Sequence, residues 1–271
     1  SDWRDLLASP VSHRIEEIEL GNRGSMDDYL DILLASKDLP SLRRLILWKG
    51  QIDDAGIIRL AQSSLGQRLT HLALHASTTH ERIPDDVLAS IGGMPGLRKL
   101  CYRGSRTIIR PEAFLEAGSS MRLEALDLSG HNLEDGGAGI QSLLAAPTFA
   151  GLRSLNLSVT GLRDLQGITS SPHLGQLQKF SLNRNGLVDR DVETLWDSPV
   201  LDGVEELELQ GNRLSMRGAL TSPRLHSLRS LRFDGSHVPQ TVTKEFVSSP
   251  LFQRLHVLDI DDNPMTRPIE T

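Results

Sequence analysis

The 271-residue sequence has little cysteine and few aromatic residues: Cys101 is its single cysteine, and aromatic residues make up 4% of the chain. One cysteine cannot build a disulfide framework, which excludes the small disulfide-stapled classes of secreted protein. No apolar run is long enough to span a membrane as a helix, and no signal peptide is visible. These absences predict a protein of the reducing cytoplasm.

An excess of basic residues is also missing. The 29 lysines and arginines are outnumbered by 35 aspartates and glutamates, which gives a net charge of −6. A general nucleic-acid binder needs a basic face to displace counterions from the phosphates. We therefore expect neither a nucleic acid nor a membrane among the partners.

Motifs for catalysis are absent as well. The sequence has no Gly-Lys pair of a P-loop, no Gly-x-Ser-x-Gly, no His-Glu-x-x-His and no Cys-x-x-Cys. The glycine-rich stretch 136–139 lacks dinucleotide-binding spacing and is expected to open a helix. Because no nucleophile, base and acid form a recognisable set, we expect no enzyme activity, no cofactor and no bound metal.

What the sequence does contain is a repeated unit, seen clearly in residues 204–214. Apolar side chains at Val204, Leu207, Leu209 and Leu214 frame Asn212 in the pattern L-x-x-L-x-L-x-x-N-x-L. The frame recurs at intervals of 24 to 29 residues, starting at Ile15, Leu42, Leu69, Leu97, Leu123, Leu152, Leu177, Val204, Leu228 and Leu255. This is the strand-and-turn signature of a leucine-rich repeat.

A helical stretch is predicted after most of these strands, and a proline often follows it. The predicted helices cover residues 26–36, 53–63, 84–91, 111–117, 135–145, 189–196 and 239–247, with shorter ones at 163–169 and 215–220. Each unit is thus a strand, a turn and a helix. Trp196 is expected to pack in the core on the helical side.

The sequence resembles the ribonuclease-inhibitor-like class of leucine-rich repeat proteins, whose units also pair a strand with a helix. The stretches Asp54–Ala61 and 171–174 (Ser-Pro-His-Leu) are similar to large bacterial families of this type. The resemblance covers residues 11–265 and implies an α/β, right-handed solenoid (horseshoe) of about ten repeats. It implies parallel strands on the concave face, helices on the convex face, and binding of a partner without catalytic residues.

We predict one domain over residues 1–271, with residues 1–10 as an N-terminal half-repeat or cap and residues 266–271 as a tail. Extracellular members of the family usually carry cysteine-rich caps, and their absence favours a cytoplasmic protein. Leu255, Leu258 and Ile260 would have no further layer above them. The last repeat is therefore expected to be closed by further native sequence or by self-association.

In the family, the asparagine of the frame turns inward and hydrogen-bonds backbone groups of adjacent turns, forming a ladder. Asn185, Asn212 and Asn263 hold this position here. Smaller polar residues replace it at Ser77, Ser105, Thr160 and Ser236, whereas Arg23, Gly50 and His131 depart from it. The resemblance therefore implies a looser ladder in the first half of the chain.

Positions three, five and seven of each frame should face the concave side, because the leucines between them point inward. In repeats two to four these positions bring together a basic and aromatic set that we name the Trp48 patch. Its members are Arg44, Ile46, Trp48, His71, His75, Lys99, Cys101 and Arg103. Trp and Arg are enriched at binding hot spots, so the patch is the predicted partner-binding site. The alternative is an ordinary solvated surface.

Three further alternatives stay open. Cys101 between basic neighbours is either a reactive thiol or a small filler, the latter being favoured. Asp259, Asp261 and Asp262 either bind a hard cation or keep the last strand soluble, the latter being favoured. The chain itself is either a non-catalytic, scaffold-type interaction module or the recruiting or regulatory repeat region of a larger multidomain enzyme or signalling protein.

Overall fold

The computed structural model describes most of the chain, in two compact units formed by residues 1–131 and 132–271. It describes residues 5, 7, 9, 11–21, 27–36, 39–48, 52–75, 81–116, 118, 120–235, 238 and 240–261. Five of the ladder positions lie outside these residues, namely Arg23, Gly50, Ser77, Ser236 and Asn263. Asp262 lies outside them too.

Ten parallel strands begin at the third position of the ten sequence frames, as predicted. In unit 1 the order is β1 (Glu17–Gly21), β2 (Arg44–Trp48), β3 (His71–His75), β4 (Lys99–Arg103) and β6 (Ala125–Asp127). In unit 2 it is β8 (Ser154–Asn156), β9 (Lys179–Ser181), β10 (Glu206–Glu208), β11 (Ser230–Arg232) and β12 (Val257–Asp259). Two further strands, β5 (Ile108–Ile109) and β7 (Asn132–Leu133), have two residues each.

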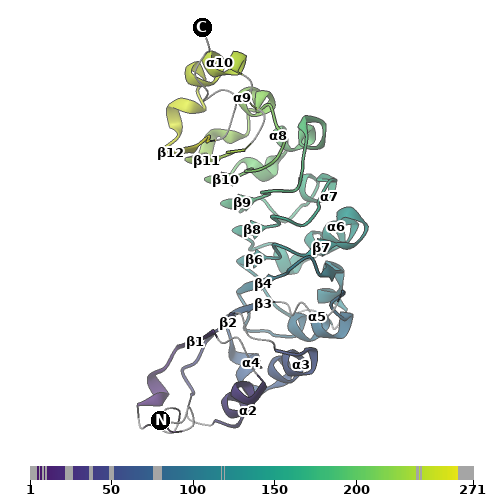
Figure 1. Ribbon diagram of the computed structural model, residues 1–271, viewed down its shortest axis with the longest axis vertical. Coiled ribbons are helices and arrows are strands. Elements are labelled where there is room, and N and C mark those ends of the chain that lie inside the picture. Colours follow the sequence, from purple (N-terminus) through teal and green to yellow (C-terminus); the bar gives the residue numbers. More distant parts are fainter. Residues whose placement is uncertain are drawn as a thin grey trace. The chain divides into compact units, whose positions relative to one another are not determined.

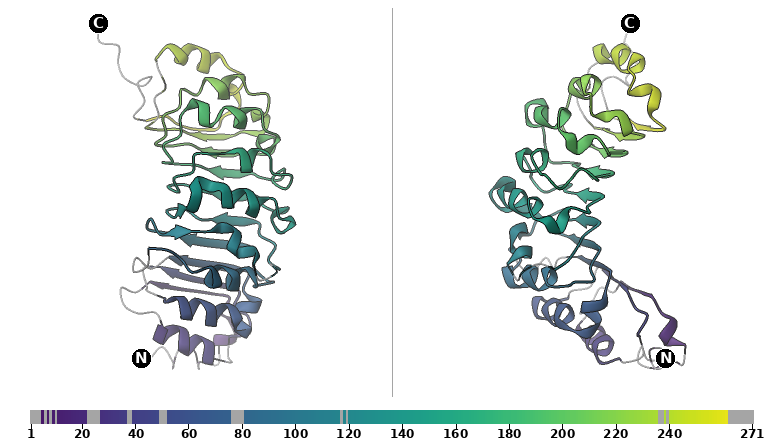
Figure 2. Two further views of the ribbon diagram at one scale, coloured as in Figure 1. Left: turned by 90° about the vertical axis from the view of Figure 1, so that its right-hand side faces the viewer. Right: turned by 180° about the vertical axis from the view of Figure 1, so that it is seen from behind.

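The strands alternate between buried and accessible side chains, which explains why they form here. Leu45 and Leu47 of β2 are buried, whereas the residues before, between and after them are partly exposed. The same alternation recurs in β4, and side chains of period two are what a strand with one buried face requires. Strand and helix therefore share an apolar core, with helices on one side of the strands in each unit (Figures 1 and 2).

The helices agree with the predictions in the first repeats and become shorter later. The α-helices are α2 (Asp27–Ala35), α3 (Asp54–Gln62), α4 (Ser64–Arg68), α5 (Asp85–Gly92), α6 (Ala138–Leu144), α7 (Gln166–Thr169), α8 (Glu193–Trp196), α9 (Arg217–Thr221) and α10 (Thr243–Ser248). The prediction of a helix over 111–117 was only partly right, because the segment is the 3-10 helix η2 (Pro111–Leu115).

Short 3-10 helices fill many of the remaining connections. They are η1 (Ser12–Arg14), η3 (Glu134–Gly137), η4 (Pro147–Phe149), η5 (Asp189–Asp191), η6 (Pro199–Leu201), η7 (Leu225–Ser227), η8 (Gln240–Val242) and η9 (Phe252–Arg254). The glycine-rich stretch 136–139 leads from η3 into α6, as expected. Trp196 is buried at the end of α8, also as expected. Its indole lies where a side chain on Gly218 would stand.

The asparagine ladder is present in unit 2. Asn212 is buried, and its Oδ1 accepts hydrogen bonds from the backbone N–H groups of Asn185 and Leu187, both at 3.1 Å. Its Nδ2 donates to the carbonyls of Leu182 and Leu209. Asn185 repeats the arrangement one turn earlier by accepting from the N–H of Thr160 at 2.9 Å. Each side chain thus satisfies backbone groups that are buried between two repeats.

The interpretation of His131 as a departure from the ladder was wrong. Its ring is fully buried, and Nε2 lies 3.0 Å from the carbonyl oxygen of Tyr102. Leu157 and Leu182 occupy the same frame position as Tyr102, and their carbonyls accept hydrogen bonds from Asn185 and Asn212. The imidazole therefore replaces the amide as the donor between two repeats. Ser105, by contrast, is exposed, so the small-residue substitution predicted there is wrong.

The last strand is less covered than the others. Leu255, Leu258 and Ile260 are only partly buried, whereas Leu207 and Leu231 at the corresponding core positions are fully buried. Partial cover agrees with the expectation that this end of the core needs an additional layer.

Val159 combines a left-handed backbone with an exposed apolar side chain. Its φ is 59°, and its side chain is 42% exposed. The corresponding turn position holds Gly130, Gly211 and Gly235, each with positive φ. The turn after the strand thus requires this conformation, which costs a non-glycine residue about 1–2 kcal/mol and a β-branched one most of all.

We expect Val159→Asn to raise the free energy of unfolding by about 1 kcal/mol, because asparagine tolerates this region. Chemical denaturation of the two proteins measures the difference. Val247→Asn is the matched control, since Val247 is 50% exposed in the helix α10, where no such strain exists. A stability gain of equal size in both variants would show that removing an exposed apolar side chain, and not relief of backbone strain, is the cause.

Candidate functional site

The Trp48 patch lies on the face of unit 1 that is formed by the strands. The parallel register aligns Arg44 with His71 and His71 with Lys99. It aligns Ala73 with Ile46 on one side and with Cys101 on the other. The columns expected from the frame are therefore present in β2, β3 and β4. All members of the patch are partly or fully exposed, as positions that face solvent should be.

Trp48 and Arg103 are in direct contact. The guanidinium carbon of Arg103 lies 5.4 Å from the centroid of the Trp48 ring, within cation–π range. Nε of Arg103 lies 3.1 Å from Oδ2 of Asp127 on β6. The other carboxylate oxygen of Asp127 accepts from the backbone N–H of Ser129 at 2.9 Å. Two contacts therefore fix the arginine, and a backbone hydrogen bond fixes the carboxylate that holds it.

The second arginine of the patch is paired as well. Nε of Arg44 lies 2.5 Å from Oε2 of Glu17 on β1, and both side chains are more than 40% exposed. An exposed pair of this kind contributes only about 0–1 kcal/mol to stability. Lys99 makes no ion pair or hydrogen bond with the part of the chain that the structure describes. The patch is consequently less basic than its residue types suggest.

Burial also changes the titration of two groups in the patch. Desolvation lowers the pKa of His71, and the positive charges of Lys99 and Arg44 lower it further. Burial raises the pKa of the Cys101 thiol to about 12, with a further contribution from the negative charge of Asp127. A reactive cysteine needs a lowered pKa, so the raised pKa favours the interpretation of Cys101 as a small filler.

Two residues that shape the patch, Asp127 and Glu17, were not among its predicted members. Asp127 aligns with Cys101 in register, and Glu17 aligns with Arg44. Both therefore stand in the same columns of the frame, one strand beyond repeats two to four. The frame could have predicted both residues, because it places these carboxylates beside the basic side chains of the patch, and opposite charges on adjacent strands pair.

The strand face of unit 2 carries a different set of side chains. Nζ of Lys179 lies 2.8 Å from Glu206 and 3.8 Å from Glu208, and Glu208 also accepts from Ser181. Gln210 donates to Asp234 and Asp259. Among the residues that the structure describes, no group of three or more His, Cys, Asp or Glu side chains is arranged to hold a metal ion.

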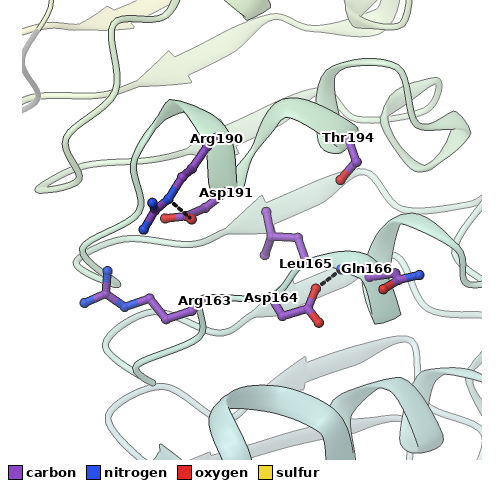
Figure 3. A pocket seen from close by; sticks show the side chains of 7 residues that line it. All are labelled: Arg163, Asp164, Leu165, Gln166, Arg190, Asp191 and Thr194. Atoms are coloured by element: carbon purple, nitrogen blue, oxygen red, sulfur yellow. Dashed lines mark hydrogen bonds and ion pairs between the residues drawn. The ribbon is translucent and has the colours of Figure 1, made fainter.

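A cavity of about 560 Å³ opens on the surface of unit 2, near helices α7 and α8 (Figure 3). It is lined by Arg163, Asp164, Leu165, Gln166, Arg190, Asp191 and Thr194. Its carboxylates are used locally: Asp164 accepts from the N–H of Gln166, and Asp191 accepts from the N–H of Val188. Two arginines and two aspartates balance in charge, so the lining selects no ligand of one sign.

Comparison with solved structures supports the architecture. An internalin (inlF) from Listeria monocytogenes superposes with a TM-score of 0.55 at 16% identity, over 97% of this chain and 72% of that one. Internalins are leucine-rich repeat proteins. The chain has a leucine-rich repeat fold. Searches against protein-family models and against curated proteins give no match.

Two other structures with the leucine-rich repeat fold match at lower scores. An internalin C2 (inlC2) from Listeria monocytogenes has a TM-score of 0.45 and 16% identity, over 82% of this chain and 80% of that one. The TLR13–ssRNA13 complex has a TM-score of 0.47 and 17% identity, over 96% of this chain and 34% of that one. Within the described residues, no helix has the length and apolar character needed to cross a membrane.

Proposed function

We propose that this leucine-rich repeat chain is a non-catalytic interaction module that binds a protein partner on its strand face, the expected concave wall, through the Trp48 patch. The observation that carries the proposal is the arrangement of Trp48, Arg103 and Asp127 described above. Trp48 is partly exposed on the strand face, so its indole is accessible to a partner while it contacts Arg103. An arginine held in advance loses less conformational entropy when a partner binds it.

The chemistry of the chain agrees with a binding role. The thiol of Cys101 has a raised pKa, whereas a nucleophilic thiol needs a lowered one. Both oxygens of the Asp127 carboxylate accept hydrogen bonds, from Arg103 and from the N–H of Ser129. We assign the chain to the ribonuclease-inhibitor-like class found in bacteria, because its early repeats pair each strand with a helix of eight or nine residues. We place it in the cytoplasm on the basis of its single cysteine.

Nucleic acid is not the proposed partner, since the net charge of the chain is negative. Self-association through the C-terminal end is a secondary proposal, supported by the partial cover of Leu258 and Ile260. Sedimentation velocity across a concentration series tests it. A protein that remains monomeric at every concentration would rule that contact out.

We expect Trp48→Ala to weaken binding of the partner by at least about 2 kcal/mol, or roughly 30-fold, because a central aromatic residue is a typical hot spot. The partner is obtained by affinity capture from a lysate of the source organism and identified by mass spectrometry. Its affinity for the two proteins is then measured by calorimetry.

Asn156→Ala is the matched control, because Asn156 occupies the strand face of unit 2 and is also partly exposed. This variant should bind nearly as tightly as the wild type. Urea denaturation of both variants checks that the fold is intact. Equal affinity of the wild type and Trp48→Ala for the captured partner would remove the Trp48 patch as the binding site.

A further inference from the structure

We propose that the Trp48 patch selects an acidic protein segment, one that places a carboxylate on the free edge of the Arg103 guanidinium and an apolar side chain against Trp48. This inference rests on the proposed function and names the chemistry of the partner. It follows from which hydrogen-bonding groups of the patch are already used and which remain available.

The guanidinium of Arg103 has a free edge. Of its five N–H donors, the one on Nε faces Asp127 at 3.1 Å. The Cys101 sulfur is a second hydrogen-bond partner of the guanidinium. The other donors, most of them on Nη1 and Nη2, have no acceptor in the described residues. The side chain is 47% exposed, so this edge is open to solvent. Two parallel N–H groups on a planar fork match the two oxygens of a carboxylate.

The arginine is also held in place before any partner arrives. The cation–π contact with Trp48 holds the guanidinium over the indole ring, and the carboxylate of Asp127 holds its Nε end. Only 16% of the Asp127 side chain is exposed, so this anchor is shielded from water. A receptor with a fixed fork distinguishes a planar carboxylate from less directional ligands.

The surroundings favour a segment that is both acidic and apolar. Lys99 lies at the other end of β4 and has no ionic partner within the described ranges, so it offers a second positive charge. Ile46 is partly exposed between the two charged columns and offers an apolar contact, while Ala73 beside it in register is buried. A segment with carboxylates at both ends and an apolar residue between them would complement all three features.

A polyanion such as RNA fits this surface less well. Glu17 and Asp127 already neutralise one end of Arg44 and Arg103, and Glu19 on β1 adds a further negative charge to the same face. Binding to a phosphate backbone requires many cations in a row. The basic side chains of the patch are separated by acidic ones, so they suit single carboxylates that are spaced along a peptide.

The test uses a fluorescein-labelled random copolymer of glutamate and tyrosine as the probe, measured by fluorescence anisotropy with the full chain. We expect the copolymer to bind, and its affinity to fall as salt is raised because the contact is partly electrostatic. A lysine–tyrosine copolymer and a single-stranded oligouridine serve as comparison probes. Both should bind at least tenfold more weakly than the acidic copolymer.

Substitutions at Arg103 separate charge from geometry. Arg103→Gln should weaken the acidic copolymer at least tenfold, and Arg103→Lys should weaken it about threefold, because lysine keeps the charge and loses the planar fork. Arg232→Gln is the matched control, since Arg232 is an exposed arginine on the strand face of unit 2. That variant should bind as the wild type does.

Three outcomes of the binding assay would overturn the acidic selectivity: no binding of the acidic copolymer, equal binding by Arg103→Gln, or tighter binding of oligouridine. A concentration-dependent dimer that Arg103→Gln abolishes would overturn it in favour of a second copy. The proposed function fails separately, when Trp48→Ala leaves capture of the natural partner unchanged. If Trp48→Ala loses that partner while Arg103→Gln keeps the copolymer, the binding site stands and the acidic selectivity falls.

Discussion

Leu182→Ala should lower the free energy of unfolding by about 2–5 kcal/mol. Leu182 is fully buried and follows β9, and Leu157 and Leu209 occupy the same frame position in the repeats before and after it. Removing the side chain leaves a cavity between stacked layers, and the neighbouring backbones have little freedom to close it. The hydrogen bonds from Asn185 and Asn212 to the Leu182 carbonyl hold that backbone in place.

The damage should extend to both neighbouring repeats, because each repeat of a solenoid is stabilised mainly by its interfaces. Urea denaturation measures the total loss, and hydrogen exchange locates it. We expect faster exchange in residues 152–214 than in the wild type. Val257→Ala on the exposed side of β12 is the control and should cost far less. A Leu182→Ala protein as stable as the wild type would show that the inward assignment of this frame position is wrong.

The positions of the strands could be predicted to within about two residues because two independent periods agree. Each frame alternates with a period of two, and the ten frames recur at 24 to 29 residues. A shift of one residue in β2 would bury Arg44, Ile46 and Trp48, so burial itself fixes the register. Ten repetitions of the same constraint leave no other parallel arrangement.

The helical side could not be predicted as well, because its sequence signals are weaker. Residues 111–117 and 189–196 begin with proline or acidic residues, as helices do, but they contain 3-10 turns. A short connection between fixed strands sets how many turns fit, and propensity is too small an effect to override it. The neighbouring strands thus determine the type of helix.

The sequence predicted where the side chains of the candidate site lie, but not which ion pairs they form. Alternation placed Trp48 and Arg103 on the strand face correctly. Which carboxylate each arginine contacts depends on side-chain rotamers, which the frame does not specify. The ion pair with Asp127 partly neutralises the positive charge of Arg103 and holds its guanidinium in one position.

His131 shows a further limit of prediction from a consensus. This frame position requires an inward-pointing side chain that donates a hydrogen bond to a carbonyl of the previous repeat. Asparagine is the commonest residue with such a donor, but histidine also has one. The ring of His131 meets Tyr102 edge to face, with the centroids 5.2 Å apart. Its Nδ1 lies against Gly104, where a Cβ would approach to 2.3 Å. Glycine at position 104 makes room for the larger ring.

Stability should therefore fall in mild acid. Burial lowers the pKa of His131 to about 4, from 6.5 for an exposed histidine, although interactions with backbone groups of Thr107 and Tyr102 oppose the shift. Above pH 6.5 the side chain is neutral in both states, and its contribution to stability is fully present. Between pH 6.5 and 4 the unfolded chain binds a proton that the folded chain does not, so stability is lost as the pH falls. The shift corresponds to about 3 kcal/mol.

His131→Asn isolates this effect, because asparagine is the ladder residue and does not titrate. Urea denaturation at pH 7.5, 6.0 and 4.5 should show the wild type losing about 3 kcal/mol more than the variant over this range. The variant itself starts from a lower stability at pH 7.5, since the amide fills less space than the ring. His226→Asn is the control, because His226 is exposed, and it should keep the pH dependence of the wild type. If the wild type and His131→Asn lost stability in parallel, the ring would have to accept its proton in the folded state. Nδ1 makes no hydrogen bond in the neutral ring, and its proton would then be donated to a nearby backbone group, for which Thr107 is the candidate.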